Sequence, residues 1–117
     1  MARTIDRVSD TMALEQVRLL SEVLFGQRYR LEVMVAIAES TTGQVCLSDL
    51  AEQLGHRGVS NIQAPLRDLV RAGLLTRLPA SDSRRRWYRR ENSLGWEFAR
   101  EAARSAPGLA LSALGSR

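Results

Sequence analysis

Apolar residues recur at helical spacing along the first third of the chain. They form one stripe of a helix predicted over residues 11–25, made of Ala13, Val17, Leu20 and Leu24. Gly26 is expected to end this helix. The next segment, RYRLEVMVAIAES, places Val33 and Ile37 beside a second stripe of Leu31, Met34, Val35 and Ala38. A helix with such a wide apolar surface is buried from two sides, so this segment is predicted to be the central helix of the core.

The middle of the chain has the pattern of a short strand followed by two short helices. TTGQVCLS combines turn residues with a brief apolar run, which predicts a strand at Gln44–Leu47. Ser48 is expected to cap the first helix, and Gly55 to close it after an inner face of Leu50, Ala51 and Leu54. The second helix must begin near Asn61 to tolerate Pro65, and its predicted inner face is Ile62, Leu66, Leu69 and Val70.

The outer face of this second helix is polar and basic. It carries Ser60, Ala64, Arg67 and Arg71, and its first turn adds Asn61 and Gln63. Amide side chains can pair with adenine in the major groove, and arginine pairs with guanine. These residues are therefore predicted to bind DNA, with Arg71 on a phosphate and Asp68 orienting Arg67 or Arg71. The alternative is that Ser60 and Gln63 form an S-x-x-Q capping box with no other role.

After RAGLL, where Gly73 marks a helix stop, the pattern changes to that of a β-hairpin. The turn PASDS separates its strands, and the return segment RRRWYRR interleaves arginines with two aromatic residues, one of which is expected to pack inward. Arg84, Arg85 and Arg86 are predicted to contact phosphates or the minor groove. The alternative is a solvated hairpin edge.

The two ends of the chain carry further apolar stripes. SLGWEFAREAARSA predicts a helix over residues 93–106, with Leu94, Phe98 and Ala102 on one face. This helix and the helix over 11–25 flank a core of residues 27–92, and they are expected to pair with a second copy of the chain or to fold back on their own core. The segment 107–117 is expected to be a flexible tail that is either mobile or weakly docked. Residues 1–117 would then form a single domain that is mainly α-helical with a small β-hairpin.

Charge is concentrated in one part of the 117 residues. All 17 basic residues are arginine, the 13 acidic residues leave a net charge of +4, and residues 56–90 hold nine arginines against Asp68 and Asp82. Such a basic region suits a polyanion. The sequence shows no phosphate-binding glycine loop or paired catalytic residues, so no enzyme is predicted. One cysteine excludes an intrachain disulfide, and no signal peptide or membrane span is evident, which together indicate a cytoplasmic protein.

The order of predicted elements resembles the winged helix-turn-helix domains of bacterial transcriptional regulators, and the ArsR-like group in particular. LSDLAEQLG is similar to that group's second helix, IQAPLRDLVRAGLL to its recognition helix, and RRRWYRRE to its second wing strand, over about Leu31–Glu91. The turn GHRGVS is one residue longer than is usual there, and Ala64-Pro65 replaces a polar pair.

Metal-sensing members of the group carry two cysteines in the segment that VCLSDL matches, whereas this chain has Cys46 and Ser48. One cysteine and one histidine are too few donors for a soft-metal site, so no metal or other cofactor is expected. Cys46 is predicted to be a small buried residue, and His56 to be a polar loop residue.

The resemblance implies a dimeric repressor that binds double-stranded DNA at a pseudo-palindromic operator. Two recognition helices would then lie one DNA turn apart. Whether an unidentified effector or a protein partner controls DNA binding stays open. The alternatives are a winged-helix protein-interaction or assembly module that binds an acidic partner, and a nonspecific DNA-binding protein.

Overall fold

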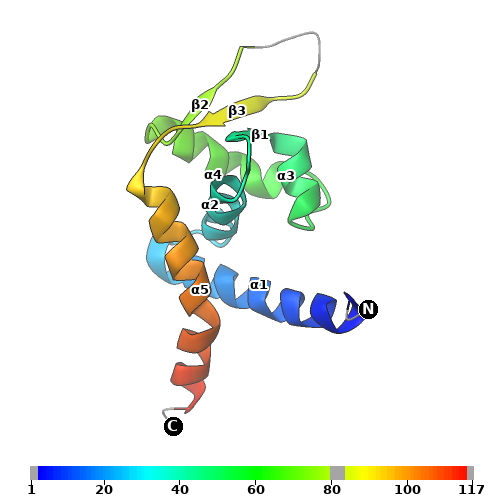
Figure 1. Cartoon of the computed structure of the whole chain (residues 1–117), viewed down its shortest axis with the longest axis vertical. Coiled ribbons are helices and arrows are strands. Elements are labelled where there is room, and N and C mark those ends of the chain that lie inside the picture. Colours follow the sequence, from blue (N-terminus) through cyan, green and yellow to red (C-terminus); the bar gives the residue numbers. More distant parts are fainter. Residues whose placement is uncertain (1–2, 80–83, 116–117) are drawn as a thin grey trace.

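The chain folds into a winged helix-turn-helix unit with an additional helix at each end (Figure 1). The computed structural model describes the backbone of residues 3–79 and 84–115, and the side chains of residues 13–79 and 84–105. Within these ranges the elements are, in chain order, α1 (Arg3–Phe25), α2 (Arg30–Ala38), β1 (Gln44–Cys46), α3 (Leu47–Gln53), α4 (Ser60–Arg71), β2 (Leu75–Arg77), β3 (Trp87–Arg90) and α5 (Leu94–Gly115). The fold class predicted from the sequence is confirmed.

The central position predicted for α2 is confirmed by its burial. Leu31, Val33 and Ile37 are fully buried, and they lie on more than one side of the helix. Both flanking helices and α4 pack against α2. A helix surrounded in this way has no solvent-facing side to make polar, which accounts for the almost unbroken apolar sequence.

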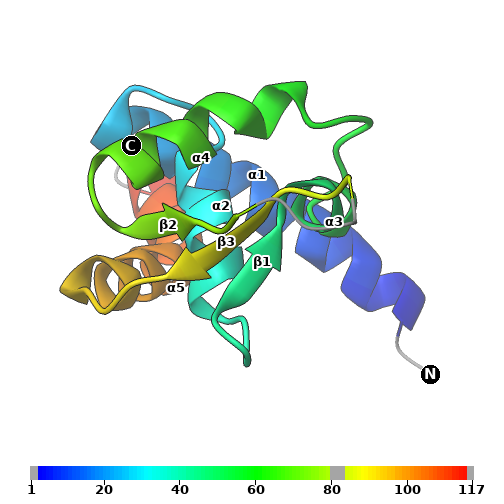
Figure 2. The same cartoon turned by 90° about the horizontal axis from the view of Figure 1, so that it is seen from above.

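The three strands form one antiparallel sheet in the order β1-β3-β2, with β3 in the middle (Figure 2). Val45 lies opposite Tyr88, and Arg77 lies opposite Tyr88 on the other side. Successive residues of a strand point to opposite faces, so Tyr88 is buried in the core while Trp87 is only half-buried on the other face. The prediction that one aromatic residue packs inward is confirmed, and this residue is Tyr88.

The helix-turn-helix is formed by α3 and α4. Gly55 has a φ of +81°, which residues with a side chain rarely adopt, and it turns the chain out of α3. In α4, Ile62, Leu66 and Leu69 are buried, as the helical pattern predicts, and Val70 is half-buried. Pro65 is also buried, inside a helix that starts only five residues earlier.

Neither predicted serine cap is present. The residue that precedes α4 is Val59, with no side-chain cap, and the amide of Gln63 bonds to the carbonyl oxygen of Val59. Ser60 is already inside the helix, so the capping-box interpretation is wrong. Likewise α3 begins at Leu47, which places Ser48 within its first turn and ends β1 one residue earlier than predicted.

The two flanking helices pack on the core and on each other. Val17, Leu20, Phe25 and Ala102 are partly buried against the core, so part of the apolar surface is covered by the same chain. In Figure 1, α5 runs away from the sheet and α1 crosses the molecule on the side of α2 remote from it; the molecule measures 54 × 34 × 24 Å. None of the described helices is both long enough and apolar enough to span a bilayer.

Both flanking helices are longer than predicted. The first begins at Arg3, and α5 continues through Pro107 to Gly115. The segment predicted to be a flexible tail therefore has helical backbone up to that residue, while residues 116 and 117 lie outside the described part. Proline has no backbone N–H to donate and disfavours a helix interior, yet the backbone of α5 continues as a helix past residue 107 to Gly115.

Candidate nucleic-acid interface

The outer face of α4 is exposed along its length. Asn61, Gln63, Arg67 and Arg71 are all exposed, as is Ser60, whereas Ala64 is half-buried. The helical pattern thus correctly predicts which side chains of α4 face solvent and which pack against α2. The face is available to a ligand, and its first turn presents hydroxyl and amide groups before the arginines begin.

A groove of about 290 Å³ separates this face from the sheet. Its basic lining comes from three different elements: Arg67 and Arg71 from α4, Arg77 from β2, and Arg86 from the segment before β3. Gln63, Leu47, Val70 and Tyr88 also line it, and none of the lining residues within the described ranges carries a carboxylate. Four guanidinium groups with no acidic group among the lining residues attract an anion with several charges, and their planar donor forks match phosphate oxygens.

The arginines of the wing have different environments. Arg84, Arg85 and Arg86 are exposed, and the turn residues 80–83 lie outside the described part. Arg86 lines the groove. Arg85 forms an ion pair with Asp49 of α3, with Nη1 at 2.9 and 3.0 Å from the two carboxylate oxygens.

The two arginines at the end of β3 lie outside the groove. Arg89 pairs with Glu91 at 3.1 Å. Arg90 donates from Nη1 to three carbonyl oxygens after or at the end of α2, those of Ile37, Ala38 and Ser40, at 2.8, 3.0 and 3.0 Å. The guanidinium group supplies a charged donor to the carbonyl groups at the end of the helix, of which that of Ile37 also accepts from the amide of Ser40. Arg90 is therefore a structural residue.

Two features of this region were missed in the sequence. Arg77 lies directly opposite Tyr88 in the sheet, and antiparallel pairing of the two hairpin strands could have placed it beside Arg86. Asp68 was expected to orient Arg67 or Arg71, but its carboxylate accepts a hydrogen bond from Arg30 of α2 at 2.6 Å. Asp68 thus links α4 to α2 and does not orient Arg67 or Arg71.

His56 lies in the loop between α3 and α4, as the sequence predicts, but its side chain is buried and hydrogen-bonded. Its side chain is only 4% exposed, and Nε2 lies 2.8 Å from Oε2 of Glu32, a buried residue of α2. The same carboxylate binds the guanidinium group of Arg18 through two nitrogens, and this hydrogen bonding raises the pKa of Arg18. On the other side of the ring, Nδ1 of His56 lies 3.2 Å from the side-chain nitrogen Nδ2 of Asn61.

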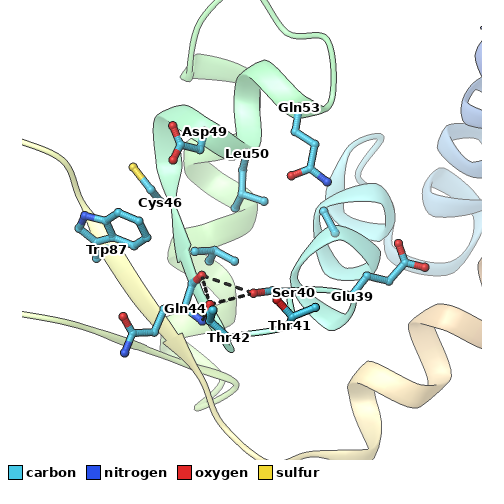
Figure 3. Close-up of a pocket in the computed structure, with 12 residues that line it drawn as sticks. Glu39, Ser40, Thr41, Thr42, Gln44, Cys46, Asp49, Leu50, Gln53 and Trp87 are labelled. Carbon is cyan, nitrogen blue, oxygen red and sulfur yellow. Dashed lines mark hydrogen bonds between the residues drawn. The ribbon is translucent and has the colours of Figure 1, made fainter.

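A second hollow, of about 400 Å³, lies beside β1, between this strand and the helices α2 and α3 (Figure 3). Its lining includes Glu39 and Asp49 and, among the residues that the structure describes, no basic one, so it does not suit a polyanion. Cys46 lines it and is buried, as predicted. Burial opposes ionisation of this thiol, but hydrogen bonds from Ser48 and the backbone of Asp49 prevail and lower its pKa. Among the described residues no group of three potential metal ligands converges.

These features define a winged helix with an arginine-lined groove between α4 and the wing formed by β2 and β3. No protein-family model matches the chain, and its sequence matches no curated protein. Among solved structures it is similar to NadR, a winged-helix transcriptional regulator of the MarR family, whose structure was determined with 4-hydroxyphenylacetate. The similarity covers 97% of this chain and 81% of NadR, with 25% identity and a TM-score of 0.56.

This likeness supports a winged-helix transcriptional regulator. The neighbour is a regulator and not an enzyme. The narrower resemblance to the ArsR-like group stays a prediction, because the structural neighbour belongs to a different group of winged-helix proteins.

Proposed function

We propose that the protein is a sequence-specific regulator that binds double-stranded DNA and acts as a dimeric repressor at a pseudo-palindromic operator. The observation that carries this proposal is the groove in which Arg67, Arg71, Arg77 and Arg86 meet beside the exposed amide groups of α4. The arginines supply phosphate contacts that fix the orientation of the protein, and the amide groups supply contacts to base edges.

The division of labour within α4 follows from position along the helix. Asn61, Gln63 and Arg67 lie in its first two turns, where a recognition helix that enters the groove by its N-terminus meets base edges. Arg71 is the last residue of the helix and is assigned to a phosphate. The wing residues Arg84, Arg85 and Arg86 are assigned to the phosphate backbone or the minor groove, and Arg85 would exchange its ion pair with Asp49 for this contact.

The test is selection of bound sequences from a random double-stranded DNA library with purified protein. We expect an enriched inverted repeat. Replacement of Asn61, Gln63 or Arg67 by alanine should cost about 1–3 kcal/mol on the selected site and much less on unrelated DNA. Arg71→Ala is the matched comparison, since it should weaken binding to both DNAs equally.

Two results would contradict the proposal. If all sequences are retained equally, the protein is a nonspecific DNA-binding protein. If no DNA binds at low salt, the exposed arginines serve an acidic protein partner, and the protein-interaction module becomes the better account of the groove.

The dimer is proposed on the apolar surface that the flanking helices leave uncovered. Leu19, Val23 and Leu24 of α1 are 50%, 81% and 43% exposed, and Leu94 and Phe98 of α5 are 78% and 49% exposed. Phe25 and Phe98 pack edge to face, with 6.4 Å between their ring centroids, and this contact joins the exposed faces of the two helices into one surface. A second copy would bury this surface and present two recognition helices to one DNA site.

Sedimentation equilibrium tests the dimer. We expect a dimer at tens of micromolar for the wild-type chain and a monomer for Val23→Asp, because a buried unpaired carboxylate disfavours association. Gln53→Asp, an exposed position on α3, is the control and should remain dimeric. A monomeric wild-type protein would refute the dimer while leaving the DNA-binding proposal to the selection experiment.

A further inference from the structure

A continuous chain of polar contacts leads from the flanking helix α1 to the second residue of α4. Arg18 of α1 binds the carboxylate of Glu32, that carboxylate binds His56, and His56 contacts Asn61. Glu32 is 2% exposed and the His56 side chain 4% exposed, so the two central members of this series of contacts are shielded from water. Asn61 itself is exposed on the outer face of α4. The only histidine of the protein thus links a buried carboxylate to a side chain assigned to base contact.

Within this series of contacts, the role of each atom as donor or acceptor follows from that of its neighbour. A carboxylate oxygen only accepts hydrogen bonds, so the Nε2 of His56, at 2.8 Å from Glu32, carries the proton. In a neutral ring the Nδ1 then has a lone pair and accepts. The group of Asn61 that faces it at 3.2 Å is the amide nitrogen, which is a donor.

The ring itself has little freedom to reorient. Tyr29 packs against it edge to face, with 4.8 Å between the ring centroids and 90° between the planes. The buried carboxylate fixes one edge of the imidazole, and the aromatic contact fixes its plane.

We infer that His56 is a positioning residue that sets the orientation of the Asn61 amide for base recognition. With one Nδ2–H directed to the imidazole, Asn61 keeps its second N–H and its Oδ1 for a base edge. A donor beside an acceptor is the pair that matches N7 and N6 of adenine. An amide turned the other way would face the Nδ1 lone pair with its oxygen, which is repulsive. This inference rests on the proposed function.

Two nearly isosteric substitutions separate the two edges of the ring. In His56→Asn the side-chain oxygen can take the place of Nδ1 and accept from Asn61, but the contact with Glu32 is lost. In His56→Gln the amide can reach Glu32 in place of Nε2, but the acceptor beside Asn61 is lost. Both variants remove a buried ring, so both lower stability, and circular dichroism at the assay temperature must first show that each is folded.

The readout is binding to the selected DNA site and to sites changed one base pair at a time. Asn61→Ala should reduce discrimination by about 5- to 150-fold at one base pair. His56→Gln should lose most of the discrimination at that same base pair and retain it elsewhere, and His56→Asn should lose less. In the Asn61→Ala background, His56→Gln should have no further effect on base preference.

Two results would overturn the inference while leaving the proposed function intact. One is wild-type discrimination by a folded His56→Gln protein. The other is an equal loss at every base pair read by α4, which would mean that His56 only holds the helix in place. If the wild-type protein shows no sequence preference, the proposed function fails first, and the role of His56 in recognition fails with it.

A spectroscopic measurement on the DNA-free protein tests the orientation directly. Because the chain has one histidine, its two ring nitrogens are assigned in a long-range ¹H–¹⁵N spectrum without ambiguity. The expected tautomer has the proton on Nε2, and the side-chain amide signals of Asn61, identified by their loss in Asn61→Ala, should shift in His56→Gln. A proton on Nδ1 in the neutral ring would refute the arrangement whatever the protein binds.

Discussion

Arg86→Ala removes one guanidinium group from the groove without disturbing the core. Arg86 is exposed, and it lines the groove together with Arg67, Arg71 and Arg77. If it neutralises a DNA phosphate, its loss leaves one fewer counterion to be released on binding. Affinity should then fall for every sequence, and it should depend less steeply on salt.

The expected size of the effect follows from counterion release. Each phosphate contact contributes about −0.9 to the slope of log K against log salt, so a dimer that loses two contacts should change its slope by about 1.8. Between 50 and 200 mM salt, one such contact corresponds to a change in affinity of roughly 3.5-fold. The difference between wild type and variant should therefore be large at low salt and shrink as salt rises.

Fluorescence anisotropy titrations on one labelled duplex at several salt concentrations measure this slope. Arg89→Ala is the matched control, because it removes the same charge from an exposed wing residue that pairs with Glu91 and lies outside the groove. Its slope should equal that of the wild type. Equal slopes for Arg86→Ala and Arg89→Ala would refute the assignment of the groove to phosphate, and the wing would be a solvated hairpin.

Three further predictions concern the scaffold. Leu66→Ala should lower the free energy of unfolding by about 2–5 kcal/mol, measured by urea denaturation, because Leu66 is 1% exposed and its truncation leaves a cavity. Base preference should not change in the protein that remains folded. Arg90→Ala should cost about 2–3 kcal/mol in the same assay, since the carbonyl groups at the end of α2 lose a charged donor. Thr76→Val should raise the pKa of Glu91, because the hydrogen bond from Thr76, followed by that from Arg89, holds this pKa below its ordinary value of 4.5. The stability that this bond contributes should be present above pH 4.5 and disappear as the pH falls through the folded-state pKa, in ¹³C titrations and in unfolding curves, with Thr76→Ser as control.

Each of these three has an outcome that would contradict it. An unchanged unfolding midpoint in Leu66→Ala would mean that the inner face of α4 is not packed as described. Full stability in Arg90→Ala would show that water serves the end of α2 equally well. An identical titration of Glu91 in Thr76→Val would remove the hydroxyl group as the cause of the lowered pKa.

The sequence alone determined those parts of the molecule that depend on local periodicity. The two-sided burial of α2 and the outward face of α4 follow from which residues recur every three or four positions, because a helix has a fixed number of residues per turn. The hairpin follows from turn residues between two short runs of alternating residues. A charge excess confined to residues 56–90 indicated the basic side of the molecule before any geometry was known.

The tertiary structure alone decided which polar groups serve the core and which remain for a ligand. Arg67 and Arg90 are the same residue type in the same basic segment, yet one lines the groove and the other satisfies carbonyl groups after α2. The prediction of serine caps was wrong for a related reason. The first residue of a helix depends on the conformation of the preceding turn, which places Ser48 and Ser60 inside their helices.

Long-range pairing explains most of what the sequence did not reveal. Glu32 is separated by 14 residues from Arg18 and by 24 from His56, and Arg30 is separated by 38 from Asp68. Periodicity within one element carries no information on such partners. A buried carboxylate nevertheless needs such partners, because an unpaired charge in the interior is costly. Glu32 finds them in Arg18 of α1 and in His56, which lies just before α4.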